Sequence, residues 1–124
     1  MSPDKPFDLQ QRLELFAARV VRYVERMPNT MAGRYFAGQL LRSGCSPPFH
    51  YGESQAAESN EDFIHKCKVA HKELKETRSN LNVQHLSELV SRSDQDLLWL
   101  RSESNELVKI MGKIISNAKR GGRR

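Results

Sequence analysis

Two lines of basic side chains recur at helical spacing and could bind phosphate. Arg12, Arg19 and Arg26 are seven residues apart, and Arg22 lies beside the last two. Residues seven apart fall on the same face of a helix, so these arginines predict a basic stripe. A guanidinium suits phosphate because its planar fork can hold two oxygens with parallel hydrogen bonds.

A second basic line lies in the middle of the chain. Lys68, Lys72 and Lys75 follow His65 at spacings of three and four residues, which again predict one face of a helix. Glutamates such as Glu73 are interspersed, so the competing interpretation is a solvated face with i,i+4 ion pairs. A surface that follows a phosphate backbone and a solvated face both remain open for the two lines.

The C-terminal residues form a third basic cluster. Lys119, Arg120, Arg123 and Arg124 supply four of the five net positive charges of this 124-residue chain, so the remaining residues carry only +1. Local clusters, rather than overall charge, must therefore support a nucleic-acid interface. The predicted nucleic-acid-binding residues are Arg12, Arg19, Arg22, Arg26, Lys68, Lys72, Lys75, Lys119, Arg120, Arg123 and Arg124.

Metal and catalytic chemistry find little support in the sequence. Asp62-x-x-His65 is the nearest match to the Glu-x-x-His motif of di-iron bundles, and it has no second copy. Cys67 and His71 are four apart and could share a metal, but Cys67 falls on an apolar stripe, where a cysteine acts as a small hydrophobe. Phosphate-cradling glycine loops and histidines at catalytic spacings are missing. We therefore expect a non-enzymatic protein without metal or cofactor.

The basic residues lie on four predicted helices. Apolar residues recur at spacings of three and four over about residues 8–27, 30–57, 59–81 and 93–120. With short connections, four such helices most simply form an antiparallel up-and-down four-helix bundle, which is an all-α fold. We expect a single domain over residues 1–120 and a short basic tail over 121–124.

Capping residues and prolines set the predicted helix ends. Ser46-Pro47 is typical of a helix restart, so the second helix should be kinked near Pro47. Asn80 and Asn82 are expected to weaken the end of the third helix. The predicted N-caps are Asp8, Ser46, Ser59 and Ser93. The apolar side of the second helix is assigned to Met31, Tyr35, Phe36 and Leu40.

Several apolar residues fall partly outside the inner stripes. They include Leu15 and Val21 on the first helix and Trp99, Val108 and Ile115 on the fourth. A bundle with apolar residues on more than one face often buries the extra face against another subunit, and a broader core stripe is the alternative. The predicted oligomer interface consists of Trp99, Val108 and Ile115.

Composition bears on the cellular compartment. No apolar run approaches the ~18 residues that a membrane span needs, so no membrane association is expected. Cys45 and Cys67 have no CxxC spacing, which favours free thiols in a reducing compartment. The first residues lack the apolar region of a signal peptide. We expect a cytoplasmic protein.

The middle of the chain carries a distinctive series of short motifs. They are Gln39-Leu40-Leu41-Arg42-Ser43-Gly44, Tyr51-Gly52-Glu53, Ala57-Glu58-Ser59 and Lys72-Glu73-Leu74-Lys75-Glu76-Thr77-Arg78. With these motifs the chain, from Phe7 to Arg120, resembles the four-helix-bundle proteins related to those encoded within intervening sequences of bacterial 23S ribosomal RNA genes. It is also similar to the accessory variability proteins of diversity-generating retroelements.

The resemblance implies an assembly and partners. Relatives form closed rings of five subunits, so a homopentamer is expected. The retroelement proteins are basic pentamers that bind nucleic acid and a reverse transcriptase, so RNA or DNA and a reverse transcriptase or RNA–protein partner are expected. The alternative function is a structural homo-oligomer or protein-interaction scaffold that binds no nucleic acid.

Overall fold

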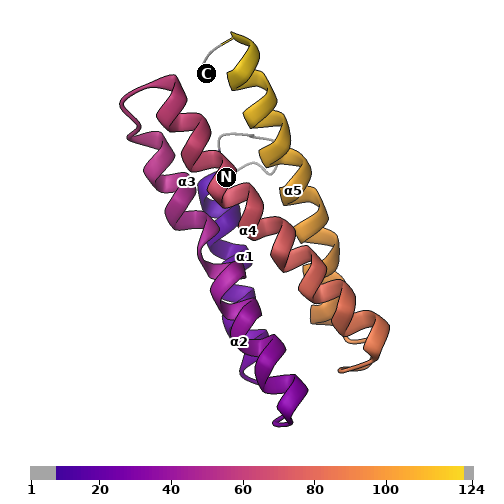
Figure 1. The fold of residues 1–124 in the computed structure, drawn as a ribbon. Coiled ribbons are helices and arrows are strands. Elements are labelled where there is room, and N and C mark those ends of the chain that lie inside the picture. Colours follow the sequence, from indigo (N-terminus) through magenta and orange to yellow (C-terminus); the bar gives the residue numbers. More distant parts are fainter. Residues whose placement is uncertain (1–7, 122–124) are drawn as a thin grey trace.

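The computed structural model describes residues 8–121, which are helical apart from short connections (Figure 1). The helices are α1 (Leu9–Val24), α2 (Met31–Cys45), α3 (Pro47–Gln55), α4 (Asn60–Ser87) and α5 (Gln95–Gly121). Helices α2 and α3 are the two arms of one kinked member, so the bundle has four members that alternate in direction along the chain (Figure 1). The all-α prediction and the kink near Pro47 are confirmed.

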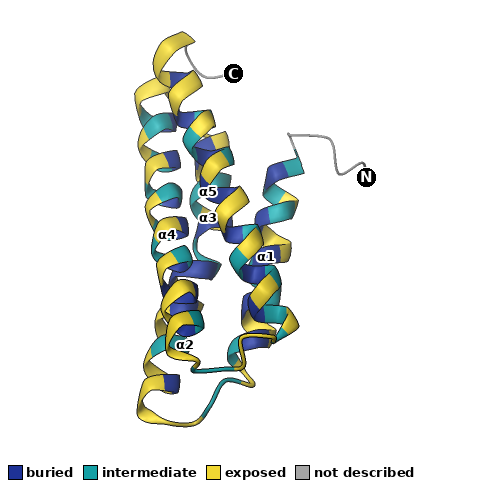
Figure 2. Cartoon of the chain, turned by 90° about the vertical axis from the view of Figure 1, so that its right-hand side faces the viewer, coloured by how far each residue is buried: buried dark blue, intermediate teal, exposed yellow. Residues whose placement is uncertain are grey.

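The core lies where the apolar stripes of the helices meet. Dark-blue buried positions recur along the helices, between exposed ones (Figure 2). Side chains with no exposed surface include Phe16 on α1, Leu40 on α2, Leu74 on α4 and Leu107 on α5. Helix α4 makes its most extensive contacts with α5, and these two long helices form one wall of the bundle.

Of the large residues predicted to face the core from α2, Leu40 is buried but Met31 and Tyr35 are exposed. Met31 is 82% exposed and Tyr35 is 61% exposed, whereas Gly33 and Gly44 are buried. A Cβ atom on Gly44 would lie only 3.0 Å from a methyl group of Val20 on α1. The glycine therefore allows the two backbones to approach closely, and the assignment of Met31 and Tyr35 to the inner side is wrong.

Helix α4 continues beyond its predicted end near residue 81, and a series of buried hydrogen bonds lies along its last turns. The Asn80 amide donates to the Phe36 carbonyl at 3.1 Å and accepts from Gln84 at 2.7 Å. Gln84 in turn accepts from the Tyr23 hydroxyl at 2.7 Å. Asn80 thus serves as a satisfied core residue that joins α2 to α4, and the helix continues to Ser87.

Replacing Tyr23 by Phe should measure how much these buried hydrogen bonds contribute to stability. Burial raises the pKa of Tyr23, so its hydroxyl keeps its proton and stays a donor. The variant leaves the buried Gln84 oxygen without that donor, which should cost about 1–3 kcal/mol of unfolding free energy in urea denaturation. Tyr35→Phe, at an exposed tyrosine, should change it by less than about 0.5 kcal/mol. Equal effects would contradict a stabilising role for the Tyr23 hydrogen bond.

Of the four predicted N-caps, Ser59 makes the expected side-chain hydrogen bond, whereas Asp8, Ser46 and Ser93 do not. The Ser59 hydroxyl accepts a hydrogen bond from the backbone N–H three residues on at 3.0 Å, as predicted. Asp8 makes no such bond, because its backbone is not in the extended conformation that directs a cap side chain toward the helix. At α5 the capping side chain is Asp94 instead of Ser93, and it accepts at 3.0 Å from the N–H three residues on.

Candidate nucleic-acid interface

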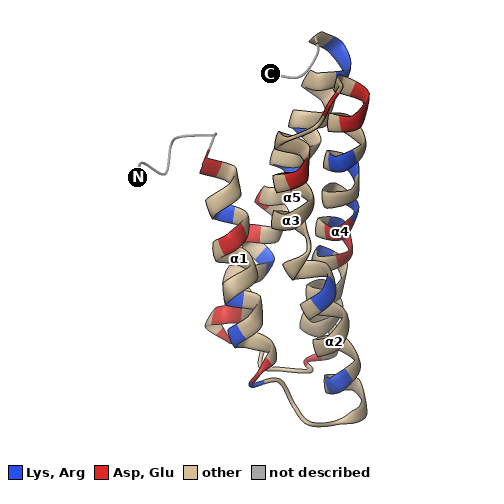
Figure 3. Cartoon of the chain, turned by 90° about the vertical axis from the view of Figure 1, so that its left-hand side faces the viewer, with Lys and Arg blue, Asp and Glu red and all other residues tan. Residues whose placement is uncertain are grey.

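Ion pairs join the predicted arginine line of α1 to α5. Arg12 binds the Glu103 carboxylate with two hydrogen bonds of 2.6 and 3.0 Å. Arg26 binds Asp94 at 2.8 Å and Asp96 at 2.6 Å. Acidic and basic positions also alternate along α1 itself (Figure 3). The fold thus neutralises much of this line, and the pairs connect α1 to the start and middle of α5.

Arg19 packs on Trp99, one of the predicted interface residues. The guanidinium carbon lies 4.0 Å from the centroid of the indole ring, and Phe16 stacks against the same ring at 6.1 Å. Arg19 also pairs with Asp96 at 3.5 Å. Arg22 is exposed and has no ion pair with any residue that the structure describes. The line predicted on α1 therefore offers one unpaired arginine to a ligand.

Arg26→Glu is expected to act on stability. It removes two ion pairs and places a carboxylate beside Asp94 and Asp96, so the melting temperature should fall by an amount equivalent to about 1 kcal/mol at low salt. The loss should shrink as salt screens the repulsion. Arg22→Glu is the matched control and should leave the melting temperature nearly unchanged. A similar loss in both variants would show that the Arg26 pairs do not hold α1 to α5.

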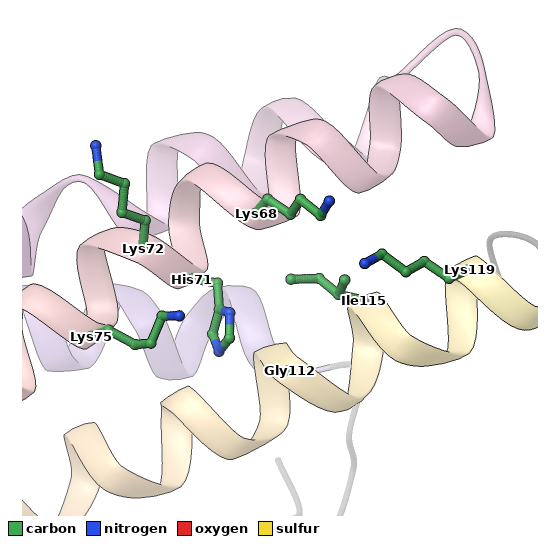
Figure 4. Close-up of a pocket in the computed structure, with 7 residues that line it drawn as sticks. All are labelled: Lys68, His71, Lys72, Lys75, Gly112, Ile115 and Lys119. Atoms are coloured by element: carbon green, nitrogen blue, oxygen red, sulfur yellow. The ribbon is translucent and has the colours of Figure 1, made fainter.

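The lysine line of α4 meets α5 in an open groove of about 380 Å³. Its lining consists of Lys68, His71, Lys72, Lys75, Gly112, Ile115 and Lys119. Figure 4 shows Lys68 and Lys119 extending toward one another near Ile115, whereas Lys72 extends away from α5. The structure therefore brings together the α4 line and one residue of the predicted C-terminal cluster.

The groove lining carries positive charge without a carboxylate. Neither aspartate nor glutamate contributes to it. Within residues 8–121, the lysines that form ion pairs are Lys66 with Asp62 and Lys109 with Glu106, and neither lysine lines the groove. The four lysine ammonium groups of the groove are thus available to an anion.

His71 lies at the α4–α5 contact inside the groove. Its half-buried imidazole points toward α5 at Gly112, where an added Cβ atom would lie 3.5 Å from Nε2 (Figure 4). Burial and the nearby Lys75 charge lower the pKa of His71, while the Val108 carbonyl acts in the opposite direction. Sequence reasoning considered His71 only as a metal ligand, so it missed this position.

The remaining predicted residues lie elsewhere. Arg120 is exposed on the last turns of α5 and donates to Ser116 at 3.1 Å and to Asn117 at 2.6 Å. Arg123 and Arg124 lie outside the described residues. Within residues 8–121, no group of three or more His, Cys, Asp or Glu side chains could hold a metal. No helix in this range is long and apolar enough to cross a membrane.

The apolar residues predicted to face another subunit are largely covered within one chain. Val108 is 8% exposed and Ile115 is 7% exposed, because both belong to the core cluster of α4 and α5. Val108 and Ile115 therefore leave little surface of their own for a second subunit. Large apolar side chains are exposed at Leu15, Val21, Met31, Tyr35, Leu41, Phe49, Val83, Leu86 and Leu98.

The protein is thus a four-helix bundle with a lysine-lined groove between α4 and α5. The chain belongs to the 23S rRNA-intervening sequence protein family, whose model matches residues 5–113. A crystal structure of a protein of unknown function from the S23 ribosomal protein family of Bacteroides thetaiotaomicron VPI-5482 is similar, with a TM-score of 0.77 and 29% sequence identity. The similarity covers 86% of this chain and 96% of that one. No curated protein matches the chain.

Proposed function

We propose that this protein is a non-enzymatic, oligomeric module that binds RNA or DNA through phosphates held in the α4–α5 groove. Four lysines and no carboxylate line the groove, and Lys68 and Lys119 extend toward one another there (Figure 4); this arrangement carries the proposal. Ammonium groups that face one another repel, and a phosphate between them would relieve that repulsion. A groove lined by one sign of charge also raises the local concentration of ligands of opposite charge.

The groove lining favours recognition of the backbone over recognition of bases. His71 is the one aromatic ring among its residues, and its ring is turned toward α5 (Figure 4). Proteins that bind unpaired bases usually stack them on exposed aromatic side chains, and the exposed Tyr35 and Phe49 lie on other helices. Phosphate contacts position a nucleic acid without reading its sequence. We therefore expect little sequence preference.

Titration of labelled RNA and DNA duplexes at several salt concentrations tests the proposal. Each duplex phosphate neutralised should contribute a slope of about −0.9 in a plot of log affinity against log salt. If three to four groove lysines contact phosphate, the slope should be roughly −3 per subunit. Absence of binding at low salt would reject the proposal, and binding that does not depend on salt would reject the phosphate contacts.

A second candidate function is a homo-oligomeric scaffold, which the exposed apolar residues of α2 and α4 favour. Tyr35, Phe36 and Val83 line a groove of about 240 Å³ between these helices. Met31 is 82% exposed and Leu86 is 71% exposed. Soluble monomers seldom expose large contiguous apolar surfaces, so we propose that this side of the bundle contacts another subunit.

Light scattering coupled to gel filtration should give an assembly mass near five times the 14.2 kDa of one chain. The family resemblance supplies the number five, and the exposed residues of α2 and α4 supply the contact surface. Val83→Glu should lower the mass, because it places a charge in that contact. Arg22→Glu, on α1, should leave it unchanged. A monomer mass at micromolar concentration would contradict the oligomer.

Binding and assembly would reinforce one another. A closed ring repeats the α4–α5 groove in every subunit, so several weak phosphate contacts act on one nucleic acid and the overall affinity rises. A reverse transcriptase or an RNA–protein complex, the partner that the resemblance implies, would meet the module on the same nucleic acid. The scaffold function alone would require the oligomer but no salt-dependent binding.

A further inference from the structure

His71 is placed where an anion in the groove would change its surroundings. On its own helix it is flanked by Lys68 and Lys75, each one turn away, and Lys72 precedes the second of them. From α5, Lys119 lines the same groove. Arg78, further along α4, is close enough to His71 for its charge to lower the pKa of the imidazole. The charged groups that face His71 are thus all positive, from both helices packed around it.

The free groove disfavours a proton on His71. Burial, then the charge of Lys75, lowers its pKa, and Arg78 acts in the same direction. The hydrogen bond to the Val108 carbonyl opposes these effects without reversing them. At neutral pH the unliganded imidazole is therefore mostly neutral.

We propose that the groove takes up a proton at His71 when it binds phosphate, so that nucleic-acid affinity increases as the pH falls below neutral. This inference rests on the proposed function, because it concerns the same groove. The phosphate offsets the repulsion from Lys68, Lys75 and Lys119, and it can accept a hydrogen bond from the imidazolium N–H. Gly112 leaves space above the ring, since no Cβ atom covers its Nε2 edge.

The sign of the effect follows from linkage. An anion that raises the pKa of His71 must, by reciprocity, bind more tightly when His71 is protonated. With one proton per site, affinity can increase by at most about tenfold per pH unit between the unliganded and liganded pKa values. Lysines and phosphodiesters keep their charges across this range, so they add no such dependence.

His65 provides a matched control on the same helix. It is an exposed histidine two turns before Lys72, and it does not line the groove. It also has Lys68 one turn away, but it lacks the burial of His71 and its place in the groove. If the pH dependence of the affinity came from overall charge, substituting either histidine would reduce it. If it comes from the groove, only the substitution of His71 should reduce it.

The test is a titration of a labelled RNA duplex from about pH 5.5 to pH 8 at constant ionic strength. The wild-type protein and His65→Gln should gain about three- to tenfold in affinity per pH unit on acidification. His71→Gln should lose most of this gain, so that its affinity depends on pH far less than that of the wild type. A circular dichroism spectrum confirms that the variants remain helical.

A second readout follows His71 directly. NMR titration of the imidazole in the wild-type protein should show a higher pKa with bound RNA than without it. An unchanged His71 pKa, or the same pH dependence in His71→Gln as in the wild type, would overturn the inference while leaving nucleic-acid binding intact. Loss of the pH dependence in His65→Gln alone would overturn it too. Absence of RNA binding at every pH would instead reject the proposed function.

Discussion

Reversing two charges of the groove, with Lys68→Glu and Lys119→Glu combined, should nearly abolish nucleic-acid binding while the protein remains helical. These side chains extend toward one another from α4 and α5 (Figure 4), and neither pairs with a carboxylate of the described residues. The double variant removes two phosphate contacts and adds two repulsive charges. We expect at least a ~100-fold loss of affinity at moderate salt and a salt slope reduced by about two.

The combination of Lys109→Glu and Lys113→Glu is the matched control for this experiment. Both lysines are exposed on α5 and neither lines the groove, so the control changes the net charge equally. It should weaken binding only through the long-range field, by several-fold at low salt. Equal losses in the two double variants would mean that net charge, and not the groove, determines binding.

Leu74→Ala should produce the largest loss of stability among the single changes considered. Leu74 is fully buried on α4, in the core that this helix shares with the rest of the bundle. Truncation removes buried apolar surface and leaves a cavity that close-packed neighbours fill only in part. The cost should be about 2–5 kcal/mol of unfolding free energy, measured by urea denaturation.

Leu86→Ala is the control on the same helix. Its side chain is 71% exposed, so truncation should change the unfolding free energy of one chain by less than about 0.5 kcal/mol. If Leu86 lies in a subunit contact, its substitution should instead lower the assembly mass. A negligible loss for Leu74→Ala would show that the apolar register of α4 is incorrect.

The spacing of apolar residues, together with the Ser46-Pro47 pair, was sufficient to predict all four members of the bundle. Leu13 and Phe16, Leu74, and Leu107 recur at helical periods and are all buried. On α2 this spacing placed Leu40 correctly but missed the buried glycines, because glycine has no side chain to mark a buried face. Periodicity therefore selected the large residue Met31, although Gly44 makes the close contact with α1.

The basic side chains could be located from the sequence, but their partners could not. Arg12 pairs with Glu103, which is 91 residues away, and no local spacing predicts that contact. Lys119 was assigned to a C-terminal cluster. Yet Gly112, Ile115 and Lys119 are three and four residues apart, so their shared helix face was readable. The missing information was that α5 presents this face to the lysines of α4.

Lysine footprinting on the wild-type protein tests the location of the nucleic-acid interface most directly. The protein is acetylated briefly with and without saturating RNA duplex, and the modification of each lysine is measured by mass spectrometry. We expect RNA to reduce acetylation at Lys68 and Lys119 severalfold, while Lys109 and Lys113 on α5 react as before. Unchanged reactivity at Lys68 and Lys119 under saturating RNA would contradict binding in the α4–α5 groove.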